Sequence, residues 1–326
     1  MSIRTLRVLA ATWCVLAGVC LWGVFLMGAR DAAPLALTAT VGSDGDTVYY
    51  DAVINGTPHI LARRLSAWNR TPRIVARNAC HPYLTRNGRA MFFERQSERG
   101  GTEIWRHEVD SGQQSRVYST RHDAYIHDVD HEGTRLIITV ARFAGGLGAV
   151  TQEHLIDGKN GDVLFSDIGF GACFVTDGGV VFSAPASGQL RLLDKEGRVL
   201  DLNRQGYFPR SSLSGQKVLF VRDLDERFNR RQWQVLDLVS NKVQMIRGGI
   251  GPALGPDDNS VILQTELNAP LLRFDLTTGV HSPMTQSHGA IAKILPCPGG
   301  VAARAEGPVN WVIVITEKAI YQEVIR

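Results

Sequence analysis

The sequence predicts an all-β fold, a β-propeller of seven four-stranded blades that follows one N-terminal transmembrane helix. Three observations lead to this prediction. A polar turn that contains glycine recurs about every 42 residues. Each turn is followed by a β-branched run and then by a second pair of strand-like runs around another tight turn. Signals of helix formation are nearly absent after residue 29.

The first element is an apolar segment, residues 8–29, whose 22 residues carry no charge. An α-helix rises about 1.5 Å per residue, so this segment is long enough to cross a hydrocarbon core of roughly 30 Å. Because a cleaved signal peptide usually has a shorter apolar region, we expect an uncleaved anchor, with a removed signal as the alternative. Arg4 and Arg7 precede the segment, so the positive-inside rule places residues 1–7 in the cytoplasm.

The repeat begins after a linker at residues 30–34 and occupies residues 35–326. Its clearest mark is the turn between the first two strands of each unit. The turn residues are Gly45, Gly88, Gly133, Gly178, Gly215 and Gly299, with Asp258 at the sixth place. Successive turns are separated by 43, 45, 45, 37, 43 and 41 residues. Residues that tolerate φ > 0 are typical of such hairpin turns.

The second half of each unit also recurs, as in "TEIWRHEVDSGQQSRVYS" (102–119) and "APLLRFDLTTGVHSPMT" (269–285). Each of these segments reads as a strand, a tight turn and another strand, which gives four strands per unit. Four short strands per repeat are typical of a propeller blade, which buries its faces only against neighbouring blades. The first and last units match least well, so six or eight blades remain open alternatives. The final strand, 319–326, is expected to complete the last blade by itself.

The form of the repeat resembles the WD40-like PD40 repeat of TolB-type propellers. The best match combines Pro82 and "TRNGRAMFF" with the later "EIWRHEVDSG", and a second combines "GPDDNSVIL" with "LLRFDLTTG". The resemblance extends over almost all of the region after the anchor. It implies a propeller architecture, and its short motif carries no functional residues.

Composition excludes several classes of function. The net charge of +3 is small for 326 residues and argues against a nucleic-acid surface. Cys80, Cys173 and Cys297 are widely spaced, so we expect free thiols, with one long-range disulfide as an alternative. Motifs of nucleophilic hydrolases, P-loops and dinucleotide sites are absent, so we expect no catalytic residue and no organic cofactor.

The stretch "HDAYIHDVDHEG", residues 122–133, is the densest in potential metal ligands. The repeat divides it in two. His131 and Glu132 fall in the third copy of the recurring turn, where we expect solvent-exposed residues without a catalytic role. The preceding residues fall in the innermost strand of the third blade and in the loop that leads into it. We expect these to line the rim of the central channel, namely His122, Asp123, His127 and Asp128.

Two further histidines, His81 and His288, precede the second and seventh blades at the equivalent place. Together with His127 they offer imidazoles from three blades near one end of the axis, which is a candidate site for a divalent metal. Tyr207 and Arg210, in the fifth blade, are expected to add to the rim. The alternative is that all these side chains are polar lining without a ligand.

The predicted function is that of a binding or assembly module of the cell envelope. The propeller would face the periplasm, held at the bacterial inner membrane by a single-pass anchor, and would bind an envelope protein or an extracellular polymer. The alternative is an enzyme of the lyase, cyclase or hydrolase type that uses a metal held by the channel histidines. We lean toward a protein without catalytic activity.

Overall fold

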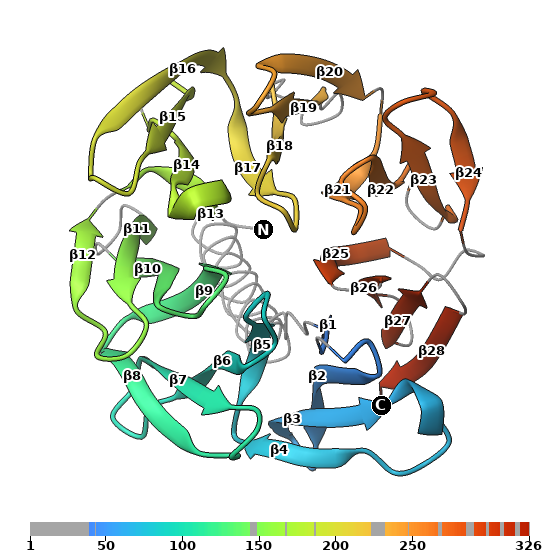
Figure 1. Ribbon diagram of the computed structural model, residues 1–326. Coiled ribbons are helices and arrows are strands. Elements are labelled where there is room, and N and C mark those ends of the chain that lie inside the picture. Colours follow the sequence, from blue (N-terminus) through green and yellow to red (C-terminus); the bar gives the residue numbers. More distant parts are fainter. Residues whose placement is uncertain are drawn as a thin grey trace, which may run out of the picture. The chain divides into compact units, whose positions relative to one another are not determined.

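The computed structural model describes residues 39–326 apart from positions 43, 144–148, 167, 186, 223–231, 247, 267–268, 285–289, 298–299, 307–309, 317–319 and 326. Leu37–Arg326 forms one compact unit. The described strands form seven four-stranded antiparallel sheets, arranged around an axis as blades (Figure 1). The predicted all-β propeller of four-stranded blades is confirmed.

The strands of the first four blades follow the chain in order. Blade one contains β1 (Ala39–Val41), β2 (Thr47–Ile54), β3 (Thr57–Arg64) and β4 (Arg73–Arg77). Blade two contains β5 (Cys80–Leu84), β6 (Ala90–Gln96), β7 (Thr102–Glu108) and β8 (Gln114–Thr120). Blade three contains β9 (Asp123–Val129), β10 (Arg135–Phe143), β11 (Ala149–Asp157) and β12 (Val163–Ser166). Blade four contains β13 (Phe170–Phe174), β14 (Val180–Ser183), β15 (Gln189–Leu193) and β16 (Val199–Gln205).

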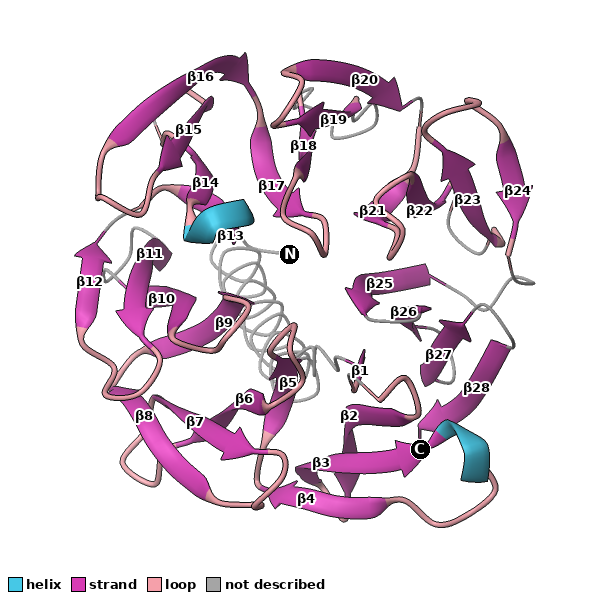
Figure 2. Cartoon of the chain, in the orientation of Figure 1, coloured by secondary structure: helices cyan, strands magenta, loops and turns pink. Residues whose placement is uncertain are grey.

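The remaining blades repeat this plan. Blade five contains β17 (Tyr207–Ser211), β18 (Lys217–Val221), β19 (Trp233–Asp237) and β20 (Lys242–Ile246). Blade six contains β21 (Ile250–Leu254), β22 (Ser260–Gln264), β23 (Leu271–Asp275) and β24 (His281–Pro283). Blade seven contains β25 (Ala290–Cys297), β26 (Gly300–Glu306), β27 (Asn310–Thr316) and β28 (Ile320–Ile325). Two short 3-10 turns, η1 (Leu65–Ala67) and η2 (Thr176–Gly178), are the helical elements of the described residues (Figure 2).

The first strand of every blade lies nearest the axis and the fourth lies at the circumference (Figure 1). Each blade is built from consecutive strands, including the last, as the sequence predicted. Blades seven and one therefore meet by packing, with β1 against β25 and β26. Val314 of β27 belongs to the same apolar cluster as Val41 and Tyr50 of blade one.

The hydrophobic core lies between adjacent blades. One cluster joins Phe92 and Ile104 of blade two to Ile126 and Leu136 of blade three, all at most 3% exposed. Similar clusters join blades one and two, three and four, four and five, and five and six. A sheet with two apolar faces has no other way to bury both, which is why the repeat closes into a ring.

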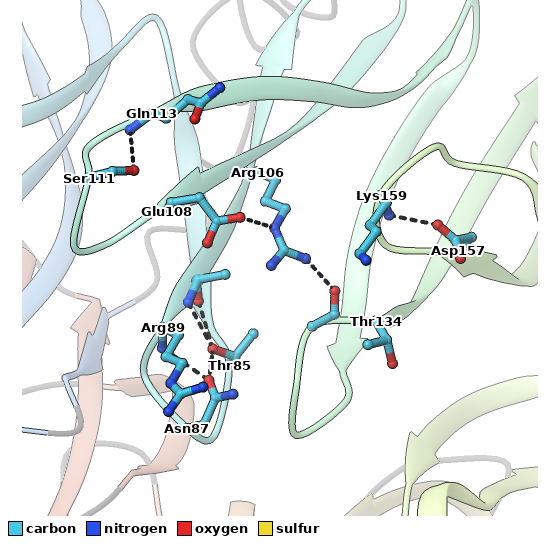
Figure 3. Close-up of polar contacts among 12 residues, drawn as sticks. Thr85, Asn87, Arg89, Arg106, Glu108, Ser111, Gln113, Thr134, Asp157 and Lys159 are labelled. Carbon is cyan, nitrogen blue, oxygen red and sulfur yellow. Dashed lines mark hydrogen bonds and ion pairs between the residues drawn. The ribbon is translucent and has the colours of Figure 1, made fainter.

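The turn residues predicted from the repeat have the conformation that the prediction requires. Positive φ angles occur at Gly45 (64°), Gly88 (71°), Gly133 (69°), Gly178 (75°), Gly215 (74°) and Asp258 (57°). Gly299 lies outside the described residues. Some of these turns also pack against the preceding blade: a Cβ built on Gly133 would lie 2.7 Å from Cγ2 of Thr85. The guanidinium of Arg106 bonds to Glu108 and donates to the carbonyl oxygen of Gly133 at 2.5 Å (Figure 3).

The predicted anchor, residues 8–29, lies outside the described residues. Within the described part of the chain, no helix is long and apolar enough to span a membrane.

Candidate functional site

A β-bulge recurs near the start of four inner strands. In β5, β13, β17 and β21 the pairing with the second strand shifts register after the first residue. The second residue of each strand has a positive φ angle, and we call these four residues the bulge ring: His81 (53°), Gly171 (64°), Phe208 (53°) and Gly251 (56°). Because the inner strands of all blades run in the same direction, the four bulges lie at one end of the axis.

Two members of the bulge ring are glycines and two are bulky. A left-handed backbone costs a residue with a Cβ roughly 1–2 kcal/mol, and glycine avoids this strain. Blades four and six therefore carry the residue that the conformation favours, whereas blades two and five carry His81 and Phe208. Strained residues of this kind persist where the side chain provides a compensating interaction.

His81 has its compensating interaction within the protein. Its Nδ1 lies 2.6 Å from Oε2 of Glu94, and the two side chains are only 14% and 5% exposed. The backbone N–H of His81 donates to Oδ2 of Asp51 in blade one at 3.0 Å. The other oxygen of Glu94 accepts a hydrogen bond of 2.8 Å from the N–H of Ile126 in blade three. This pair thus connects three consecutive blades.

The electrostatics of the pair favour an imidazolium beside a carboxylate. Burial opposes the charge on His81, but hydrogen bonds to Cys80 and Glu94 and the negative charge of Glu94 raise its pKa to about 11. Burial raises the pKa of the neighbouring Cys80 thiol. At neutral pH both His81 and Cys80 therefore carry their protons.

The raised pKa of His81 predicts that the stability of the fold depends on pH. An unfolded histidine titrates near pH 6.5, so the stability contributed by His81 is complete below about pH 6.5 and is lost as the pH rises toward 11. In the presence of a chelator, the urea midpoint of wild type should exceed that of His81→Gln by much more at pH 6 than at pH 10. A difference between the two proteins that does not change with pH would contradict the assigned charge state.

His81, Cys80 and Glu94 also form the one group of potential metal ligands found among the described residues, with donor atoms within 4.8 Å of one another. A thiolate, an imidazole and a carboxylate are donors that zinc accepts. Both Cys80 and His81 would have to lose a proton to bind it, and the raised pKa values of both groups oppose this. The group therefore fits an ion pair better than a metal site.

Two of the three histidines predicted to share a metal, His81 and His127, lie among the described residues. His127 lies on β9 with an exposed side chain and does not belong to the ligand group of His81. It occupies the bulge of β9, between the pairs Ile126–Ile138 and Asp128–Ile137. His288 lies outside the described residues.

The rim residues predicted in blade three have different roles. His122 is exposed and its N–H donates to Oγ1 of Thr120, and Asp123 is exposed at the start of β9. Tyr125, which the prediction did not include, is 46% exposed between Asp123 and His127. Asp128 contributes to packing between blades, because its carboxylate accepts hydrogen bonds from the backbone N–H groups of Val129 and of Phe174 in blade four.

The recurring turn in blade three is confirmed as an exposed turn. The side chains of His131 and Glu132 are 64% and 58% exposed. Glu132 nevertheless accepts a hydrogen bond of 2.7 Å from Nδ2 of Asn87 in the turn of blade two.

Phe208 is the most exposed aromatic residue of the bulge ring. Its side chain is 47% exposed, although its backbone is left-handed. A Cβ built on Gly171 would lie only 2.6 Å from the Cα of Phe208, so the bulges of blades four and five are in close contact. Nearby on β17, Arg210 is exposed and donates to the carbonyl oxygen of Pro252 in blade six at 3.1 Å. The ring of Tyr207 lies against Gly188 of blade four.

Arg86 connects two distant blades at the end of the inner strands opposite the bulge ring. It lies in the turn between β5 and β6 of blade two. Its guanidinium donates to the carbonyl oxygen of Leu213 and to Oγ of Ser211 in blade five, both at 2.8 Å. It also donates to the carbonyl oxygen of Phe174 at 3.2 Å. Blades two and five are not neighbours in the ring, so this side chain spans the region between the inner strands at the turn end. The exposed aromatic residues lie toward the bulge end.

Comparisons with known proteins identify the architecture. No protein-family model and no curated protein sequence matches the chain. Among solved structures, the chain is similar to the β-propeller domain of the trilobed protease from Pyrococcus furiosus, described as having an open velcro topology. The TM-score is 0.64 with 15% identity, covering 88% of this chain and 96% of that one.

Two further structures are similar in the same way. An oligogalacturonate lyase in complex with manganese has a TM-score of 0.65 and 12% identity, covering 87% of this chain and 92% of that one. TolB from Acinetobacter baumannii has a TM-score of 0.51 and 15% identity, covering 76% of this chain and 66% of that one. At these identities the likeness shows the fold alone. The predicted resemblance to TolB-type propellers holds at the level of architecture.

Proposed function

We propose that this chain is a binding or assembly module of the bacterial cell envelope, which engages an envelope protein or an extracellular polymer at the bulge end of its ring. The observation that carries the proposal is Phe208. This aromatic side chain is half-exposed, and its backbone adopts a conformation for which two equivalent blades use glycine. A side chain kept at such a position without burial is best explained by a contact outside the chain.

The surroundings of Phe208 suit recognition of a protein or a polymer. Exposed aromatic residues supply large rigid contact surfaces, and Tyr125 offers a second one on the inner strand of blade three. Arg210 and His127 add exposed polar side chains on the inner strands of blades five and three. We further propose that residues 8–29 anchor the chain in the inner membrane with the propeller in the periplasm.

The alternative function is a metal-dependent propeller enzyme of the lyase, cyclase or hydrolase type. One similar structure is a lyase in complex with manganese, so the fold is compatible with such an activity. In this chain the convergent donors are Cys80, His81 and Glu94, and two of them hold protons that a metal must displace. We therefore favour the binding module.

The proposal is tested by affinity capture of the full-length, membrane-anchored chain with mild cross-linking. A specific partner should be captured by wild type and reduced at least about tenfold by both Phe208→Ala and Phe208→Gly, since both remove the aromatic ring. The glycine variant should be more stable than the alanine variant by about 1 kcal/mol, because only glycine relieves the left-handed backbone.

Leu200→Ala provides the matched control. Leu200 is 48% exposed on β16 at the circumference, so its loss removes a similar exposed apolar surface away from the bulge ring. Capture should be unchanged in this variant. If Phe208→Ala captures the partner as wild type does, the bulge end is not the binding surface.

A further inference from the structure

Blade one contains a cavity whose lining includes arginines and no acidic residue. The cavity has a volume of about 430 Å³ and lies along β2, β3 and the segment that joins β3 to β4, where η1 is found (Figure 2). Its lining residues are Thr47, Tyr49, Ala62, Arg63, Arg64, Ala67, Arg70, Thr71 and Arg73. Four of the nine are arginines and none is acidic.

The nearby carboxylates are occupied elsewhere. Asp44 accepts hydrogen bonds from the N–H and the hydroxyl of Thr47 at 2.8 and 2.7 Å, which close the turn between β1 and β2. Asp46 accepts from the N–H and the hydroxyl of Ser66, both at 2.7 Å, which hold η1 in place. Neither acid lines the cavity. Burial opposes the charge on Asp44, but hydrogen bonds from Thr47 and Asp46 and the positive charge of Arg64 lower its pKa, so Asp44 balances part of the charge of Arg64.

The arginines differ in how they are held. Arg63 is fixed, because its Nη1 donates to the carbonyl oxygen of Trp68 at 2.9 Å and its guanidinium lies 5.1 Å from the centre of the Trp68 ring. Arg64, Arg70 and Arg73 are exposed. In the part of the chain that the structure describes, no ion pair joins these three to a carboxylate. One guanidinium is thus preorganised, and three exposed ones lie around the cavity.

We propose that this cavity binds a ligand with several negative charges of the phosphate class, either a soluble phosphate ester or the phosphate of a lipid headgroup. Like charges gathered around one cavity repel one another, and an oxyanion between them removes that repulsion. Guanidinium groups bind phosphate oxygens through paired charge-assisted hydrogen bonds, and Thr71 adds a hydroxyl at the same wall. Four positive charges match a multiply charged group better than a single carboxylate.

The size of the cavity supports a ligand larger than inorganic phosphate. Small-molecule sites typically enclose about 300–1,000 Å³, which includes a cavity of about 430 Å³. The cavity is open to solvent through its exposed arginines, so a phosphate attached to a larger molecule can enter it. The site uses the second and third strands of blade one, whereas the proposed partner surface uses inner strands.

The test measures binding to the full-length chain in detergent, with two probes. Both are followed by calorimetry: one titrant is pyrophosphate, and the other is mixed detergent micelles that contain either phosphatidic acid or phosphatidylcholine, so the anchor is in a micelle in every measurement. Wild type should bind pyrophosphate, phosphatidic acid, or both, and should show no saturable binding of phosphatidylcholine. Pyrophosphate binding alone identifies a soluble ligand, and phosphatidic acid binding alone identifies a lipid headgroup.

The variant Arg70→Gln/Arg73→Gln should weaken the observed binding at least about tenfold, because two charge-assisted contacts are lost. Both residues are exposed, so folding should be retained, which is checked by the urea midpoint. The control Arg89→Gln/Arg191→Gln removes the same charge from exposed positions in blades two and four and should bind as wild type does. Absence of binding to either probe, or an equal loss in the control, overturns the proposal.

Discussion

Glu94→Ala is expected to lower the free energy of unfolding by about 3–5 kcal/mol, the usual effect of removing one partner from a buried ion pair. Glu94 is 4% exposed and neutralises His81 at 2.6 Å. Its removal takes away the hydrogen bond and the counter-charge that keep the buried His81 protonated, and leaves the N–H of Ile126 without its acceptor. The measurement is urea-induced unfolding of both proteins at pH 7.

Glu196→Ala is the control for this prediction. Its carboxylate lies 3.3 Å from Nη2 of Arg198, but the two side chains are 48% and 70% exposed, so the pair is solvated. The expected loss is much smaller than that of Glu94→Ala, because solvent screens an exposed pair. Equal effects of the two variants would show that the pair between His81 and Glu94 does not hold the blades together.

Gly215→Ala is expected to destabilise the protein by about 2–5 kcal/mol. Alanine at this position has to adopt φ near 74°, and its Cβ would lie 2.7 Å from the backbone carbon of Val175 in blade four. The first effect costs roughly 1–2 kcal/mol, and the overlap with the backbone of the preceding blade adds a further cost of about 1–3 kcal/mol. The urea midpoint measures the sum.

Gly197→Ala separates these two effects. Gly197 also has a positive φ, 82°, but a Cβ there would meet no atom within 4 Å. This variant should therefore lose only the roughly 1–2 kcal/mol of backbone strain. If both variants are destabilised equally, the recurring glycine serves only the turn and not the contact between blades.

The sequence was informative where the fold depends on local conformation. The turn glycines are periodic because each hairpin needs a positive φ, and Asp258, placed at the sixth turn by spacing alone, has φ of 57°. The alternation of apolar residues likewise identifies strands from their immediate neighbours. Both signals depend on residues close together in the chain, so they can be read from it directly.

The candidate site was only partly predictable. His81, Tyr207 and Arg210 were selected from their place in the repeat, but Glu94 was not, because its role depends on three different blades. One feature of the sequence could have identified the bulge ring. A proline follows the left-handed residue in three of the four strands, at Pro82, Pro209 and Pro252. Asp128 was assigned to the rim from its place in the repeat, and the hydrogen bond that its carboxylate accepts from Phe174 of blade four could not be predicted from the repeat.

The arginine cavity was missed because its charges lie in a loop that varies between repeats. The segment from Arg63 to Arg73 contains four arginines and no acidic residue. This local excess is hidden in the overall net charge of +3. Charge counted along short windows, rather than over the chain, is the signal that would have drawn attention to it.

The first and last blades are each built from consecutive strands and share none, which affects how these two blades are held together. At every other boundary between blades, the polypeptide itself links the two sheets and keeps their effective concentration high. Between β28 and β1 the described strands have no such link, and the described contact there is apolar packing, with Val314 in one cluster with Val41 and Tyr50. Among the described blade boundaries, this is therefore the one where two sheets could separate without a change in the backbone between them.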